Sequence, residues 1–130
     1  MLRDFFLGPR ARRRWLAVFI VLSAVTLVVA LLPAERAPEA SGWDKLDHAL
    51  AFAALGAVGV FALHWLRRGV VLVLPLLAGL GALIEFLQMF VPSRMADVHD
   101  LLADVVGAAI GTGLAWIVVR VLGERPPRGR

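Results

Sequence analysis

The stretch 81-GALIEFLQMFVPSRMADVHDLLADVVGAAIG-111 places polar and charged side chains inside strongly apolar sequence. These side chains are Glu85, Gln88, Arg94, Asp97, Asp100 and Asp104. A charged group near the middle of a membrane helix costs roughly 2.5–3.5 kcal/mol on insertion scales, so such groups usually face a partner or a water-filled cavity. The stretch therefore predicts a polar site inside a membrane protein.

The composition supports a membrane location. The chain has 130 residues, and 60% of them are hydrophobic. A soluble chain of this length has too small a core to hide so much apolar surface. Cysteine is absent, which excludes disulfides, thiolate catalysis and zinc–thiolate sites. We therefore predict an integral membrane protein.

Four apolar segments predict the fold. They cover residues 15–32, 45–66, 70–91 and 100–122. A hydrocarbon core of about 30 Å needs about 20 helical residues at 1.5 Å per residue, which matches each segment. The predicted fold is all-α, an integral membrane bundle of four transmembrane helices, with a basic arm at residues 1–14 and a polar tail at 123–130.

The arginines predict the orientation. They concentrate in the amino-terminal arm, in the turn after the second segment and in the tail, and these three parts lie on one side of a four-helix bundle. Positive charge marks the cytoplasmic side. We therefore predict that both termini are cytoplasmic and that the other two loops face outward.

The polar residues recur at helical spacing, so each group shares one face of its segment. The groups are Asp44, Asp47 and His48; Gly81, Glu85 and Gln88; and Asp97, Asp100, Asp104, Gly107 and Gly111. The topology brings these groups together near the outer surface, and the glycine spacing predicts close helix packing below them. We predict a pocket lined by His48, Glu85, Gln88, Arg94, Asp97, Asp100 and Asp104, with Asp44, Lys45 and Asp47 at its rim.

The predicted pocket holds more acids than cations. Six carboxyl groups face two fixed cations, Lys45 and Arg94. They cannot all stay ionised at low dielectric, so we expect one acid to be protonated or a cation to be bound. Arg94 is expected to clamp a carboxylate with two hydrogen bonds and to hold the outer loop over the site, and Gln88 to orient the acids.

A metal is one reading of this excess of acids. Imidazole and carboxylate oxygens suit a divalent ion. The chain has no HExxH motif, no pair of histidines at ligand spacing and no other ligand set of fixed spacing. The prediction therefore assigns no metal ligands and no cofactor, and leaves a divalent cation open.

The sequence gives less support to three other functions. Glu85 and Gln88 could serve only as interhelical hydrogen-bonding groups that fix helix order, at about 0.6 and at most about 2 kcal/mol, but one or two polar residues suffice for that. Nucleic-acid binding needs basic residues interleaved with aromatics on a folded face, and here the arginines precede an apolar helix. Transport would need alternating access, and no inverted repeat is visible.

The motifs together resemble those of the VanZ-like family. They are DKxxH at Asp44, Lys45 and His48; ExxQ at Glu85 and Gln88; PxRxxDxxD at Pro92, Arg94, Asp97 and Asp100; and Asp104 with Gly107 and Gly111. The resemblance spans about residues 44–113. It implies a small multi-pass protein of the bacterial cytoplasmic membrane, in a family whose name-giving member is linked to lowered susceptibility to teicoplanin. The family usually has asparagine where this chain has Asp104.

The resemblance and the polar pocket lead to one expected function and two alternatives. We expect a contact with membrane lipids and binding of a lipid-linked or amphiphilic ligand at the outer leaflet, with a role in the cell envelope or in glycopeptide tolerance. The first alternative is a small enzyme acting on a cell-wall lipid intermediate, with His48 and Glu85 as acid and base. The second is an accessory subunit whose polar residues only guide assembly.

Overall fold

The computed structural model describes residues 2–38, 41–66 and 68–123, and these residues fold into helices joined by short loops. The long helices are α2 (Pro9–Ala30), α3 (Asp44–Leu63), α4 (Gly69–Gln88) and α5 (Val98–Gly123). A short helix, α1 (Leu2–Leu7), and a 3-10 turn, η1 (Ala34–Arg36), complete the described elements. Each long helix is long and apolar enough to cross a membrane. The predicted all-α fold with four spans is confirmed, and the chain is a multi-pass membrane protein.

The helix boundaries differ from the predicted ones by a few residues. The arm predicted at 1–14 is helical on both sides of Gly8 where the structure describes it, and α2 already begins at Pro9. Proline suits the first helical position because its missing N–H would have no partner there. Helices α3 and α4 end at Leu63 and Gln88 rather than at 66 and 91. The tail beyond Gly123 and Arg67 of the predicted turn lie outside the described residues.

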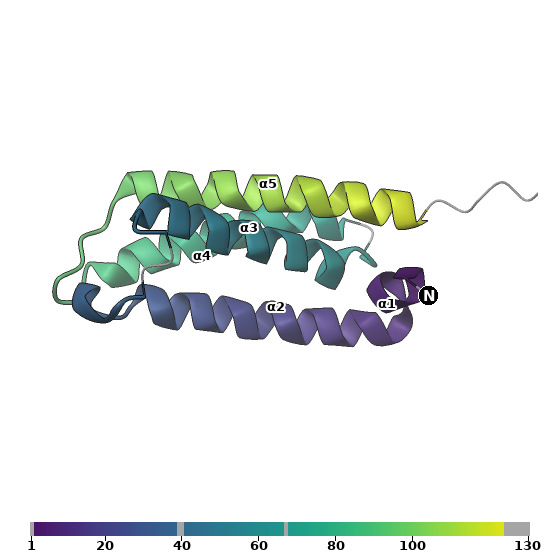
Figure 1. The fold of residues 1–130 in the computed structure, drawn as a ribbon, viewed down its shortest axis with the longest axis horizontal. Coiled ribbons are helices and arrows are strands. Elements are labelled where there is room, and N and C mark those ends of the chain that lie inside the picture. The colour runs from purple at the N-terminus through teal and green to yellow at the C-terminus, as the bar shows by residue number, and fades with distance from the viewer. Residues whose placement is uncertain (1, 39–40, 67, 124–130) are drawn as a thin grey trace, which may run out of the picture.

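The long helices run alternately in opposite directions (Figure 1). Helices α3, α4 and α5 lie together, and α2 runs along one side of them. At one end, on the left of the view, α2 and α4 finish and α3 and α5 begin; we call this the polar end. Helix α1 lies at the opposite end, beside the start of α2. The predicted convergence of three helix ends is therefore present in the fold.

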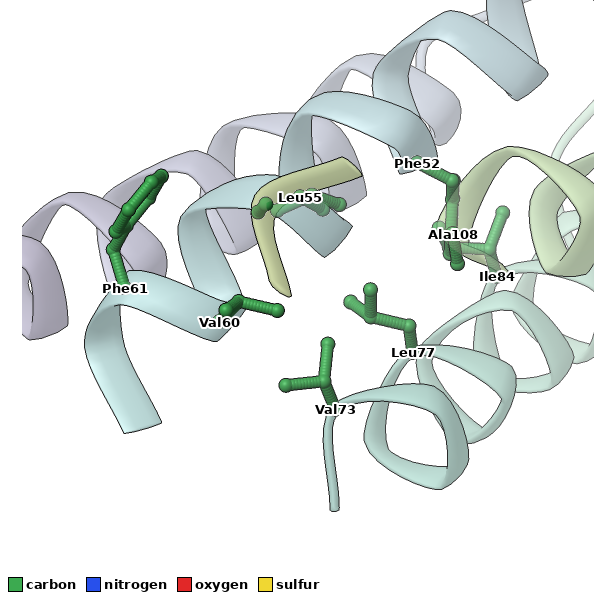
Figure 2. Packing of buried hydrophobic residues seen from close by; sticks show 9 residues of the cluster. Phe52, Leu55, Val60, Phe61, Val73, Leu77, Ile84 and Ala108 are labelled. Atoms are coloured by element: carbon green, nitrogen blue, oxygen red, sulfur yellow. The ribbon is translucent and has the colours of Figure 1, made fainter. Parts of the chain in front are cut away.

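Apolar side chains from three helices form the core (Figure 2). Helix α3 contributes Phe52, Leu55, Val60 and Phe61, α4 contributes Val73, Leu77 and Ile84, and α5 contributes Ala108. The outward faces are also apolar, as Ile20 (59% exposed), Val71 (73%) and Leu114 (62%) illustrate. Among the described residues, five polar or charged ones are by contrast buried: Glu85, Gln88, Asp100, Asp104 and Thr112. Apolar surface outside with polar groups inside is the pattern expected of a protein surrounded by lipid.

Helices α3 and α5 are in backbone contact through glycines. A Cβ atom built on Gly107 would lie 2.1 Å from the carbonyl oxygen of Ala49, and one built on Gly111 would lie 1.9 Å from that of Ala53. Small residues at this spacing let two helix backbones approach closely. The close packing expected from the glycine spacing thus occurs between α5 and α3, directly below the polar residues of both helices.

Candidate functional site

A histidine–aspartate pair joins α3 to α5 at the polar end. The Nδ1 atom of His48 lies 2.9 Å from Oδ1 of Asp104. The Asp104 side chain is completely buried and that of His48 is 11% exposed. His48 precedes Ala49, and Asp104 lies one turn before Gly107, so the glycine contact brings the short aspartate within reach of the imidazole. The pair therefore depends on the close approach of the two helices.

Glu85 connects α4 to the loop that leads into α5. Its Oε2 atom accepts a hydrogen bond of 2.7 Å from the backbone N–H of Asp97. The Glu85 residue is 8% exposed, so this contact holds the end of the loop against the bundle from inside. The other carboxylate oxygen, Oε1, is buried and has no hydrogen-bond partner among the described residues.

Lys45 forms two ion pairs at the site. Its ammonium lies 2.7 Å from Oδ2 of Asp97 and 2.8 Å from Oδ1 of Asp100. The hydrogen bond from Lys45 lowers the pKa of Asp97 below its usual value, and the N–H and ring of His99 act in the same direction. A lowered pKa adds stability at pH values above the unfolded pKa, about 4, and that stability is lost as the pH falls. The ion pairs therefore fasten the start of α5 to α3 at neutral pH.

Arg94 and Gln88 bind the end of α2, which differs from the prediction. The Nε of Arg94 donates to the carbonyl of Leu32 at 3.0 Å, and the Nε2 of Gln88 donates to that of Ala30 at 3.0 Å. No ion pair joins Arg94 to a carboxylate within the described part of the chain. The last carbonyls of a helix lack partners within it, and they carry partial negative charge. Arg94 and Gln88 thus cap α2 instead of clamping or orienting the acids.

Sequence reasoning missed the contacts that hold the loop before α5. The Oγ of Ser93 accepts a hydrogen bond from the N–H of Ala34 and donates one to Glu35, both at 3.1 Å. Ser93 has φ 65°, a left-handed conformation uncommon for a residue other than glycine. The PSR segment marks a turn, but no sequence pattern says which distant residues the turn will contact.

A cavity of about 100 Å³ lies beside the histidine–aspartate pair, between α2, α3 and α4. Its lining includes the apolar side chains of Val29, Phe52 and Ile84 and the polar side chains of Asp44, His48 and Arg94. His48 thus borders both the cavity and the buried Asp104. The predicted rim residue Asp47 also lines it, and its Oδ1 accepts a hydrogen bond of 2.9 Å from the N–H of Ser41.

The structure brings the predicted site residues to one end of the bundle, with partners that the sequence did not specify. His48 contacts Asp104, whereas the acid–base reading paired it with Glu85. Two groups place possible metal ligands within 4.8 Å of one another. They are Asp44, His48 and Asp100, and His48, Glu85 and Asp104.

Comparison with known proteins gives one family and one relative. The family model described as VanZ/LLP1 matches residues 8–119 of this chain. An uncharacterized protein of Schizosaccharomyces pombe is 30% identical over 114 residues, in an alignment that covers 85% of this chain and 67% of that protein. No solved structure matches the chain.

Proposed function

This chain belongs to the VanZ/LLP1 family, and we propose that it binds the head group of a lipid-linked or amphiphilic ligand in the cavity at its polar end. This proposal rests on the lining of the cavity, which combines apolar and polar side chains. Val29 and Ile84 offer apolar surface, and His48 and Arg94 offer groups that can hydrogen-bond a polar head. Such a combination of apolar walls and a few polar groups is typical of ligand sites.

The size of the cavity limits what it can hold. Sites that enclose a drug-sized ligand have volumes of about 300–1,000 Å³, and this cavity has about 100 Å³. It has room for part of a head group but not for a whole lipid. In our proposal the hydrocarbon chain of the ligand stays in the bilayer beside α2, whose outward face is apolar.

The proposal places the polar end at the outer surface of a bacterial cytoplasmic membrane, with both termini in the cytoplasm. Arginines near the start of α2 support this orientation, because basic residues favour the cytoplasmic side; they are Arg10, Arg12, Arg13 and Arg14. A role in envelope homeostasis or in tolerance of teicoplanin is proposed from the family resemblance. Since a relative occurs in a fungus, the bacterial setting belongs to the proposal and not to family membership.

Filling the cavity tests the proposal. Val29→Trp places a large side chain in the cavity, and Val28→Trp is a matched control because Val28 is 62% exposed on the outward face of the same helix. With a short-chain polyprenyl phosphate as the probe, native mass spectrometry should show binding weakened at least about tenfold, or about 1.4 kcal/mol, by Val29→Trp. The control should bind as the wild type does. Equal binding by both variants would show that the ligand does not bind in the cavity.

The contact between His48 and Asp104 favours a second candidate, an enzyme that acts on a lipid intermediate of the cell wall. A carboxylate that orients an imidazole is a common arrangement for general acid–base catalysis. Here Glu85 would be the second acid or base near His48, since both belong to one group of ligand atoms. The enzyme reading requires that the wild type turn over a labelled lipid intermediate and that His48→Gln bind it without turnover. Binding by the wild type with no turnover supports the binding function instead.

A further inference from the structure

We propose that His48, Glu85 and Asp104 bind one divalent cation between α3, α4 and α5. One ligand atom from each residue lies within 4.8 Å of the other two. Ligand atoms around a tetrahedral ion with bonds of about 2.1 Å lie about 3.4 Å apart. The ligand atoms of the three side chains therefore need to approach one another by at most about 1.4 Å to coordinate the same ion.

Two unpartnered oxygens point independently to a ligand at this position. Oε1 of Glu85 and Oδ2 of Asp104 are buried, and neither has a hydrogen-bond partner among the described residues. The two residues are 8% and 0% exposed, so water does not reach these oxygens freely. A buried polar atom without a partner bears the full cost of losing its hydration. An ion held between the two oxygens removes that cost for both.

The other oxygen of each carboxylate is already held in place. Oε2 of Glu85 accepts the N–H of Asp97, and Oδ1 of Asp104 contacts His48. Each side chain is thereby oriented, with one oxygen left for the ion. The Oδ2 atom of Asp104 faces α4, because a Cβ atom built on Gly81 would lie 2.9 Å from it. Gly81 is one turn before Glu85, so the free oxygen of Asp104 points to the helix that carries the other carboxylate.

Charge distinguishes this group from the neighbouring one. The group of Asp44, His48 and Asp100 includes a carboxylate that is already paired with Lys45 at 2.8 Å. Neither Glu85 nor Asp104 has an ion pair with a lysine or arginine within the described part of the chain. Two carboxylates and a neutral imidazole carry a charge of −2, which a divalent cation balances. The mixture of nitrogen and oxygen ligands favours Zn²⁺ or Mn²⁺ over Mg²⁺ and Ca²⁺, which prefer oxygen alone.

A cation here would also neutralise the two carboxylates that lie behind the His48 wall of the cavity. The acids Asp44 and Asp47 line the same cavity and would repel an anionic head group such as a phosphate. A divalent ion beside His48 would remove the further repulsion from Glu85 and Asp104. This role in ligand binding rests on the proposed function, whereas the cation site itself does not.

The test measures metal on the full chain in detergent. The protein is stripped with EDTA, incubated separately with ZnCl₂ and MnCl₂, desalted, and analysed for metal content and thermal stability. We expect about one ion per chain of at least one metal, and a higher melting temperature with that metal bound. Glu85→Gln and Asp104→Asn keep the size and hydrogen-bonding capacity of the side chains, and each should lower the bound metal at least tenfold. Glu35→Gln, which changes an exposed acid outside the group, should bind as the wild type does.

The outcomes are decisive for the cation site. If the wild type retains neither metal after desalting, or if Glu85→Gln and Asp104→Asn retain as much as the wild type, the proposal is overturned and the two acids hold protons instead. Failure of the proposed function is recognised separately. In that case the protein keeps its metal but binds no polyprenyl phosphate.

Discussion

Gly111→Val is expected to prevent α5 from packing against α3. A Cβ atom at position 111 would lie 1.9 Å from the carbonyl oxygen of Ala53 and 2.6 Å from its carbonyl carbon. These are backbone atoms within a helix, so no side-chain rotation can relieve the overlap. The two helices must separate, which also breaks the contact between His48 and Asp104. Overpacking a core costs about 1–3 kcal/mol, and we expect a loss at or above the upper end of this range.

Thermal unfolding in detergent, followed by tryptophan fluorescence, measures this loss. Gly113→Val is the matched control, because a Cβ atom at position 113 has no atom within 4 Å beyond its chain neighbours and the backbone of its own helix, and the same β-branched residue enters the same helix. The control should melt within a few degrees of the wild type, and Gly111→Val should melt much lower or fail to fold. Equal melting of the two variants would show that the helices are not in backbone contact at position 111.

Glu85→Leu is expected to release the loop that precedes α5. Leucine is apolar and somewhat larger than glutamate, and it cannot accept the hydrogen bond from the N–H of Asp97. This hydrogen bond is only partly buried, and a typical intramolecular hydrogen bond contributes about 0.5–1.5 kcal/mol. Because 1.4 kcal/mol corresponds to a factor of ten, amide hydrogen exchange at Asp97 should become about two to ten times faster.

Glu85→Gln separates the hydrogen bond from the charge. Its side-chain amide oxygen can still accept the N–H of Asp97, so exchange at that amide should stay near the wild-type rate. Hydrogen exchange is measured in both variants by mass spectrometry of peptides that contain Met95 to Asp97. Wild-type protection of this segment in Glu85→Leu would mean that Glu85 does not hold the loop.

The sequence was sufficient to predict the fold class and the meeting place of the polar residues. Apolar runs of membrane-spanning length gave four helices, and their alternating direction placed His48, Glu85 and Asp104 at one end. Helical spacing says which residues share a face. It does not say which neighbouring helix that face will contact, and for this reason the pairing of His48 with Asp104 rather than Glu85 could not be predicted.

The contacts of Arg94 and Gln88 could not be predicted for a different reason. Their acceptors are the carbonyls of Leu32 and Ala30 at the end of α2. Every residue has a backbone carbonyl, so the sequence around position 30 contains nothing that marks these two as partners. The excess of acids at the site suggested that Arg94 would pair with a carboxylate. In the structure its Nε instead donates a hydrogen bond to a carbonyl at the end of α2.

The central claim is that α3, α4 and α5 bring His48, Glu85 and Asp104 together at one end of the bundle. The chain has no cysteine, so introduced thiols react without background. The double variant His48→Cys with Asp104→Cys should be joined by a disulfide on oxidation with a small apolar oxidant such as iodine, as measured by intact mass. His48→Cys with Val121→Cys, at opposite ends of the bundle, should not be joined within one chain. Crosslinking of the first pair no faster than the second would contradict the account.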